Sequence, residues 1–169
     1  MAQPQVGILM GSDSDFDLMQ ETAKILKKFD IPFEMHVKSA HRSPQLVHDY
    51  VTQAAGRGIK VLICAAGGAA HLAGVAESLT ELPVIGVPIA AGALNGLDAL
   101  LATVQMPAGV PVGTVAVGKA GAANAAYFAL KIIALTDPKV AAKVKQYKVD
   151  LAASVGKKDE KLQARLKEL

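Results

Sequence analysis

The sequence is poor in cysteine and in aromatic residues. It has one cysteine, Cys64, and 4% aromatic residues. A single cysteine cannot form a disulfide within the chain, which favours the reducing cytoplasm as its compartment. Cys64 stands in the apolar run Val61–Ala65 and is expected to pack as a small core residue. The scarcity of aromatic rings argues against a surface that stacks flavin or unpaired bases.

The sequence also lacks a long uninterrupted apolar segment. The first apolar stretch, Val6–Met10, is too short for a signal peptide and leads into an acidic loop. The longest apolar-rich stretch, Ala120–Leu135, is interrupted by Asn124 and Lys131, which disfavours a membrane-spanning helix. We therefore expect a cytoplasmic protein with no membrane partner.

Basic charge is present, but it is concentrated at one end of the chain. The net charge is +3, and residues 139–169 hold nine Lys or Arg against four Asp or Glu, so the first 138 residues carry a net charge of −2. The lysines of this tail do not alternate with aromatic residues, as binding of single-stranded nucleic acid would require. We expect the tail to be a solvated helix face, and we expect no nucleic-acid partner.

Short apolar runs alternate with longer amphipathic segments, the pattern of repeated β-α units around a parallel sheet. The predicted strands are Gln5–Met10, Pro32–Lys38, Lys60–Ala65, Pro83–Val87 and Pro111–Val117. The predicted helices lie at about 18–29, 46–54, 70–79, 96–104 and 120–135. The sequence therefore predicts an α/β domain.

The composition and length predict one domain over residues 1–169, with a core of about 5–135. After Pro138 the pattern changes to Lys/Ala/Leu-rich sequence with an interruption at Gly156. We expect one or two helices in a C-terminal extension of about 137–169. Such an extension can pack on another subunit or cover its own protomer, and the sequence leaves both open.

Ligands of open parallel sheets bind at the carboxyl ends of the strands, so the loops there are the candidate site. In the first, Met10–Phe16, Gly11 allows close backbone approach, and the hydroxyls of Ser12 and Ser14 with the free N–H groups of a helix start favour phosphate. Asp15 would suit ribose hydroxyls. Alternatively Asp13 or Ser14 merely caps the helix. The loop is neither a dinucleotide fingerprint nor a P-loop.

The second loop, Ser39–Pro44, contains His41 and Arg42. Arg42 offers a planar fork of donors for phosphate, and a histidine can move protons near neutral pH. Pro44 suits the first turn of a helix. A phosphorylated substrate and a proton shuttle are indicated, although a His-Arg pair on a loop is often ordinary surface.

The third loop, Ala65–Gly74, is built mainly of alanine and glycine and places His71 at the start of a helix. Such small residues would let a flat ring lie against the backbone, or they would serve only a tight crossover. His36, in a strand, and His48, on a polar helix face, are expected to be structural or solvated. The histidines and the cysteine show no metal-ligand spacing, and no Ser-His-Asp signature is present.

Five motifs in order now identify a resemblance. They are G-S-x-S-D, S-A-H-R-[TS]-P, G-G-A-A-H-L-x-G, and the stretches Val104–Val112 and Gly118–Ala126. With matching spacings from about Val6 to Leu135, they closely resemble the class I carboxyaminoimidazole ribonucleotide mutases, the PurE family. Ala73 departs from the family's usual proline, and Ala91 and Ala99 depart from its usual serines.

The resemblance implies a flavodoxin-like three-layer α/β/α domain in a homo-octamer whose active sites lie between subunits, without a cofactor or metal. It implies conversion of 5-carboxyamino-1-(5-phospho-D-ribosyl)imidazole into 5-amino-1-(5-phospho-D-ribosyl)imidazole-4-carboxylate in purine (IMP) biosynthesis. His41 would be the general acid/base and His71 would line the carboxylate pocket. The implied substrate contacts are Ser12, Ser14, Asp15, Ser39, Arg42, Gly67, Gly68, Ala70 and Leu72.

Three rivals stay open at this point. A direct carboxylase of aminoimidazole ribonucleotide would use the same pocket, but the resembling carboxylases have lysine at the position of Arg42 and a histidine-free third loop. A flavodoxin-like domain can also be a non-catalytic phosphate or flavin module. The flavin module is disfavoured because Phe16 is the only aromatic residue in the three loops. A response-regulator switch is disfavoured because this sequence lacks the acidic pair after the first strand and the phosphoacceptor aspartate at the end of the third strand.

Overall fold

The computed structural model describes residues 3–169. The chain divides into two compact units, Met1–Ala129 and Leu130–Leu169, and each is described by itself. The first unit contains the sheet and the three candidate loops, and the second contains the end of one helix and all of the next. The single domain expected over residues 1–169 stays a prediction.

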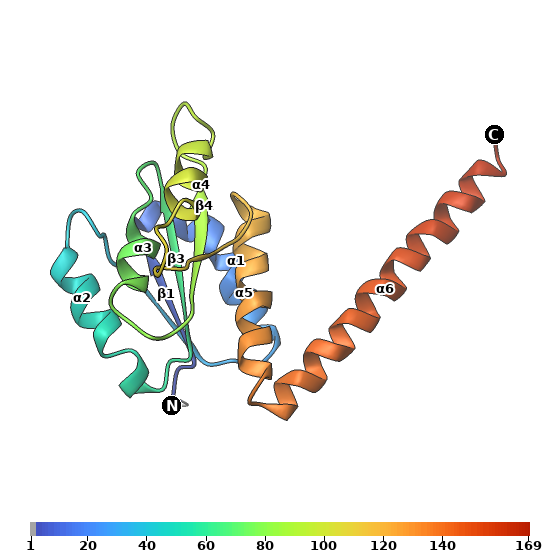
Figure 1. The fold of residues 1–169 in the computed structure, drawn as a ribbon. Coiled ribbons are helices and arrows are strands. Elements are labelled where there is room, and N and C mark those ends of the chain that lie inside the picture. Colours follow the sequence, from blue (N-terminus) through green and yellow to red (C-terminus); the bar gives the residue numbers. More distant parts are fainter. Residues whose placement is uncertain (1–2) are drawn as a thin grey trace. The chain divides into compact units, whose positions relative to one another are not determined.

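A five-stranded parallel sheet forms the centre of the first unit (Figure 1). Its strands are β1 (Val6–Met10), β2 (Phe33–Val37), β3 (Val61–Gly67), β4 (Val84–Ile89) and β5 (Gly113–Thr114). The order is β2-β1-β3-β4-β5, which is the flavodoxin-like order. In the register, Ile8 of β1 lies between Met35 of β2 and Ile63 of β3. The predicted α/β class is confirmed.

The last strand is much shorter than predicted. The sequence pattern predicts Pro111–Val117, whereas β5 is only Gly113–Thr114 and pairs with β4 through Ile85 and Gly86. Proline has no N–H to donate to a ladder, so Pro111 cannot extend the pairing. This strand is at the edge of the sheet, where apolar sequence alone does not ensure regular pairing.

Helices cover both faces of the sheet and make three layers (Figure 1). They are α1 (Phe16–Lys28), α2 (Pro44–Thr52), α3 (Leu72–Glu77), α4 (Leu97–Val104) and α5 (Lys119–Ala134), with 3₁₀ turns at Asp13–Asp15 and Ala55–Arg57. On one face, the hydroxyl of Thr22 of α1 donates a hydrogen bond to the carbonyl of Ala122 of α5 at 2.7 Å. On the other, Gly86 faces Ala73 of α3 and Thr103 of α4.

The core beneath α2 and α3 is made mainly of aliphatic side chains. Its buried members are Leu9, Val47, Tyr50, Val51, Ala54, Ile59, Leu62, Cys64, Leu72, Ala73, Ala76 and Val84. Burial raises the pKa of the Cys64 thiol to about 12, so this thiol is unreactive at neutral pH. The expectation that Cys64 is a core residue is confirmed.

The second unit contains α6 (Pro138–Leu166), one helix that continues through Gly156. The carboxylate of Asp137 caps it by accepting the N–H groups of Lys139 and Val140 at 2.9 and 3.2 Å, and Pro138 occupies the first turn, where its missing N–H is not needed. The C-terminal extension is therefore a single helix. Within residues 3–169, no helix has the length and apolarity to cross a membrane.

The close packing of β1 leads to a stability prediction. A Cβ on Gly7 would lie 2.5 Å from the Tyr50 hydroxyl and 2.8 Å from a Leu62 methyl carbon. We expect Gly7→Ala to lower the free energy of unfolding by about 1–3 kcal/mol, the usual cost of overpacking, in guanidinium denaturation at fixed protein concentration. Gly156→Ala, with open space around it, should instead stabilise by about 0.5–1 kcal/mol. Equal effects of both changes would refute the packing argument.

Candidate active site

The site forms where the strand order reverses between β1 and β3. Strands to either side of this point lead to helices on opposite faces, so their loops separate and leave a crevice. The N–H of Gly11 donates to the carbonyl of Ala65 at 3.0 Å, and the N–H of Lys38 donates to the carbonyl of Met10 at 2.8 Å. These bonds hold the ends of three adjacent strands together.

The first loop is organised by a reciprocal cap. The N–H of Ser12 donates to a carboxylate oxygen of Asp15 at 3.1 Å, and the Ser12 hydroxyl accepts the N–H of Ser14 at 3.3 Å. Ser12 therefore caps the 3₁₀ turn Asp13–Asp15. The N-cap position of α1 is Asp15, which makes no side-chain cap, so the alternative in which Asp13 or Ser14 caps the helix is wrong. Burial raises the pKa of Asp15, an effect that the Ser12 N–H and the positive charge of Arg42 only partly offset.

The second loop is a closed turn that presents His41 and Arg42. The N–H of Ser43 donates to the carbonyl of Ser39 at 2.9 Å, and the N–H of Arg42 donates to the Ser39 hydroxyl at 3.2 Å. The Arg42 guanidinium reaches the first loop and donates to the Gly11 carbonyl at 2.7 Å. Because a guanidinium has five N–H donors, this contact leaves others free to bind an anion. Pro44 begins α2, as predicted.

The third loop connects β3 to α3 through two tight turns. Gly68 adopts a φ of 61°, which is easily reached only without a side chain, and its carbonyl accepts the N–H of Ala70 at 2.9 Å. The N–H of His71 donates to the carbonyl of Ala69 at 2.8 Å. His71 then takes the N-cap position of α3, so the predicted placement at a helix start is confirmed.

The three loops enclose an open cavity of about 510 Å³, within the size range of small-molecule sites. Its lining residues are Gly11, Ser12, Ser14, Asp15, Ser39, Ala40, His41, Arg42, Ala66, Gly67, Gly68, Ala69, Leu72 and Ala91. Of the predicted site residues, only Ala70 and His71 are not part of this lining. Ala70 belongs to the third loop, but it is only 1% exposed and does not face the cavity.

One lining residue comes from a fourth loop that was not predicted to contribute. Ala91 follows β4, and its methyl group stands 3.0 Å from where a Cβ on Gly67 would lie. The loop after β4 lies next to the loop after β3 because these two strands are neighbours in the sheet. That adjacency is the signal that could have predicted a contribution from Ala91. Ala73 and Ala99, the other departures from the resembled family, are buried.

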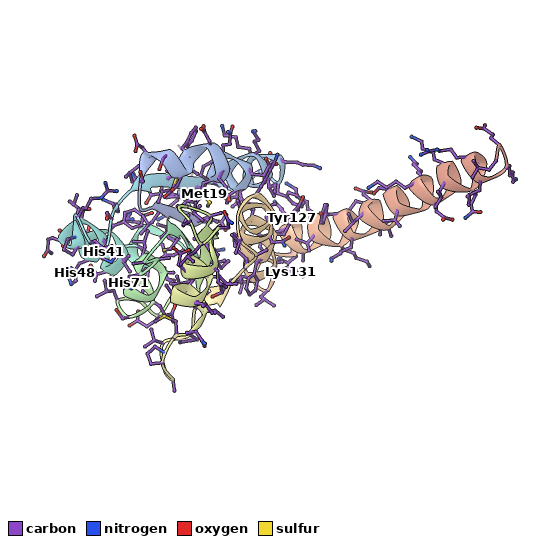
Figure 2. All side chains as sticks on the ribbon, turned by 90° about the horizontal axis from the view of Figure 1, so that it is seen from above. Met19, His41, His48, His71, Tyr127 and Lys131 are labelled. Carbon is purple, nitrogen blue, oxygen red and sulfur yellow. The ribbon has the colours of Figure 1, made fainter. Side chains whose placement is uncertain are left out.

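The two loop histidines contact each other directly. Nε2 of His41 lies 2.8 Å from Nδ1 of His71, and the two rings are nearly perpendicular at 77°. Figure 2 shows them side by side, with His48 further along on α2. His71 also lines a second cavity of about 240 Å³ with Gly74, Val75, Ser78, Ala102 and Met106. His71 is therefore adjacent to the main cavity: it contacts the lining residue His41 but does not line that cavity itself.

His36 and His48 lie outside both cavities. The ring of His36 packs against Tyr50 at a centroid distance of 5.3 Å, and His48 is paired with Asp49 at 3.2 Å. In the described part of the chain, no cluster of three or more His, Cys, Asp or Glu could hold a metal ion.

A flavodoxin-like α/β protein with a cavity at its switch point is the class that the fold and the site define. The AIR carboxylase family model matches residues 5–154, and the chain belongs to this family. The resemblance found in the loop motifs is thereby confirmed.

Curated relatives match almost the whole chain. The N5-carboxyaminoimidazole ribonucleotide mutase of Pyrococcus abyssi is 53% identical over 151 residues, which cover 89% of this chain and 86% of that protein. The protein of the same name from Mycobacterium tuberculosis is 49% identical over 161 residues, covering 95% and 91%.

Solved structures agree. The crystal structure of a Treponema denticola PurE2 variant superposes with a TM-score of 0.86 at 28% identity and covers 95% of this chain and 99% of that one. The Treponema denticola PurE structure gives a TM-score of 0.85 at 29% identity and covers 94% of this chain and 98% of that one. The flavodoxin-like fold is shared across these proteins.

The raised pKa of Asp15 predicts how an isosteric variant changes stability with pH. Because the folded state holds this proton more tightly than the unfolded chain does, ionisation of Asp15 above its ordinary pKa of 3.8 costs stability. Asp15→Asn should therefore unfold at higher denaturant concentration than the wild type at pH 7. This gain should shrink as the pH falls through the raised pKa of the folded state, and it should be absent below the ordinary pKa of 3.8.

Asp49→Asn is the opposite-sign control. Hydrogen bonds from Gln45 and His48 lower the pKa of Asp49, so its charge stabilises the fold at pH 7, and that contribution disappears in acid. The variant should be less stable at neutral pH and approach the wild type in acid. If Asp15→Asn behaved in the same way, the assignment of burial as the dominant effect on Asp15 would be wrong.

Proposed function

We propose that this chain catalyses the N5-carboxyaminoimidazole ribonucleotide mutase reaction of purine biosynthesis. The observation that carries the proposal is the joining of Arg42, the hydroxyl-rich first loop and His41 in one cavity. Relatives of this name with about half of their residues identical support it. The reaction moves a carboxylate from the exocyclic nitrogen to ring carbon 4 of the ribonucleotide.

Phosphate binding in this proposal uses the first two loops. The Ser12 and Ser14 hydroxyls and the Arg42 guanidinium supply donors to the phosphate, while Asp15 accepts hydrogen bonds from ribose hydroxyls. The contact between Arg42 and the Gly11 carbonyl, at 2.7 Å, holds the guanidinium at the mouth of the first loop. A planar, fixed cation suits bidentate recognition of phosphate oxygens.

The base lies against the small residues of the third loop. Gly67 and Gly68 present backbone without side-chain bulk, and Leu72 provides an apolar contact. Ser39 closes the second loop around the same cavity. These surfaces fit a flat heterocycle that lies against the third loop.

The chemistry needs containment and one proton shuttle. The carbamate C–N bond breaks, its electron pair stays on nitrogen, and that nitrogen takes a proton from His41. Carbon 4 then attacks the released carbon dioxide, and the proton that carbon 4 loses returns to His41. One imidazole can perform both transfers because it changes charge near neutral pH, and positioning of carbon dioxide supplies much of the remaining rate.

A comparison of substrates tests the proposal. The purified chain should convert the carbamate ribonucleotide without added ATP or bicarbonate, and much faster than it carboxylates aminoimidazole ribonucleotide in the presence of bicarbonate. A faster reaction with aminoimidazole ribonucleotide and bicarbonate would instead make the chain a direct carboxylase. Activity with neither substrate would remove the catalytic proposal.

Loss of the Arg42 side chain should weaken substrate binding. We expect Arg42→Ala to lower the affinity for the ribonucleotide by about 1.5–3 kcal/mol, the usual worth of a hydrogen bond to a charged group. Arg42→Lys keeps the charge but not the fork of donors, so its affinity for the ribonucleotide should lie between those of the wild type and Arg42→Ala. Titration calorimetry with the product ribonucleotide measures this, and unchanged affinity in Arg42→Ala would contradict the assignment.

Loss of the His41 ring should stop the proton transfers while leaving binding intact. We expect His41→Asn to lower turnover by roughly a hundredfold or more, the usual scale for a general acid/base, with little change in ribonucleotide affinity. His48→Asn, on the outer side of α2, is the matched control and should keep wild-type turnover. Near-wild-type turnover in His41→Asn would disprove the role.

We further propose that the chain is a cytoplasmic homo-oligomer, with an octamer expected from the resembled family. An apolar stripe supports assembly: Leu94, Leu97, Leu101 and Val104 recur at helical spacing along α4 and the turn before it, and each is 47–60% exposed. A stripe of this kind on a helix ordinarily faces another protein surface. A second copy of this chain is the proposed occupant.

A charge within the stripe should dissociate the assembly. We expect Leu97→Asp or Leu101→Asp to shift the molar mass measured by light scattering toward the 17.5 kDa protomer. Leu46→Asp, which changes an exposed leucine on α2 outside the stripe, should not. A wild-type protein that is monomeric and fully active at micromolar concentration would refute the oligomer.

A further inference from the structure

The contact between His41 and His71 is a ring-to-ring hydrogen bond. At 2.8 Å, Nε2 of His41 and Nδ1 of His71 share one proton. Within residues 3–169, this is the one hydrogen bond that the His41 ring makes. The orientation of that ring therefore depends on His71 and on the backbone of the second loop.

The backbone of His71 is held by the helix that follows it. It lies at the start of α3, where Leu72, Ala73 and Ala76 are at most 3% exposed, and its carbonyl accepts the N–H of Val75 at 2.9 Å. A side chain at an N-cap position commonly caps the helix, but that of His71 does not. Its Nδ1 is committed instead to His41.

His41 lies at the exposed tip of the turn from Ser39 to Ser43. The hydrogen bonds of that turn run between Ser39, Arg42 and Ser43 and involve no atom of the His41 side chain. Rotation about its χ angles is thus limited mainly by the bond to His71. An imidazole that must reach two atoms of one substrate has to be held in a narrow range of orientations.

We propose that His71 is a positioning residue that orients the His41 ring and selects its tautomer, rather than a group that binds the substrate carboxylate. The inference rests on the proposed proton-shuttle role of His41. Since one proton lies between Nε2 and Nδ1, the neutral tautomers of the two rings are tied together. Donation from His41 requires both rings in the Nε2–H form, and donation from His71 requires both in the Nδ1–H form. His71 lines the second cavity and not the main one, which agrees with action through His41.

Nuclear magnetic resonance of the ligand-free protein tests the bond itself. With nitrogen-15 in the histidine rings, we expect a scalar coupling between His41 Nε2 and His71 Nδ1 across the hydrogen bond. His71→Leu should abolish it and change the ring-nitrogen shifts of His41, while His48→Leu should leave both unaltered. Absence of the coupling in the wild type would overturn the proposal whatever the activity of the enzyme.

Steady-state kinetics with the carbamate ribonucleotide tests the consequence. His71→Leu should lower kcat by about tenfold, the order expected for one orienting hydrogen bond, with KM changed by less than about twofold. His71→Asn places an amide atom near the position of Nδ1 and should recover most of the loss. A raised KM with unchanged kcat would show a direct contact with substrate and would overturn the positioning role, as would wild-type kinetics in His71→Leu.

The two measurements separate this inference from the proposed function. If the wild type shows the coupling but does not convert the carbamate, the reaction assigned to the site is wrong although the histidine bond is real. If it converts the carbamate without the coupling, the reaction stands and the positioning role falls. Should His71→Leu fail to fold, His71→Asn and the wild-type spectrum still decide the outcome.

Discussion

The parallel pairing of β1 with β3 is the constraint on which the candidate site depends. Both strands end at the same edge, where the N–H of Gly11 donates to the carbonyl of Ala65 at 3.0 Å. From there the chain continues to α1 on one face of the sheet and to α3 on the other, which opens the crevice. Because β2 pairs with the other side of β1, the second loop arrives close enough for Arg42 to bond the Gly11 carbonyl.

The small number of ionisable side chains in the cavity suits the proposed reaction. Its lining contains one guanidinium, one imidazole and one carboxyl group, and the other lining residues are serines, one leucine, alanines and glycines. A carbamate already contains the labile bond, so the protein has to hold the ribonucleotide, retain carbon dioxide and move a proton. Arg42 and His41 are neighbours in sequence, so in the proposed reaction the anchoring of the phosphate by Arg42 would place His41 beside the base.

Local sequence signals predict much of this architecture, because strands, loop chemistry and the start of α2 at Pro44 depend on nearby residues. The resemblance of the loop motifs adds the family. What could not be predicted depends on contacts between distant segments. The bond from His41 to His71 joins residues 30 positions apart, and the contribution of Ala91 depends on the neighbouring strand. The shortness of β5 likewise follows from its place at the edge of the sheet.

In the proposed reaction the cavity, once it holds the ribonucleotide, retains the carbon dioxide released from the carbamate until carbon 4 captures it. Isotope transfer tests this most directly: the carbamate ribonucleotide is labelled with carbon-13 in its carboxylate and incubated with the protein in unlabelled bicarbonate. Retention predicts that most of the product carries the label at its carbon 4 carboxylate. A product carboxylate drawn mainly from the unlabelled bicarbonate would contradict the account.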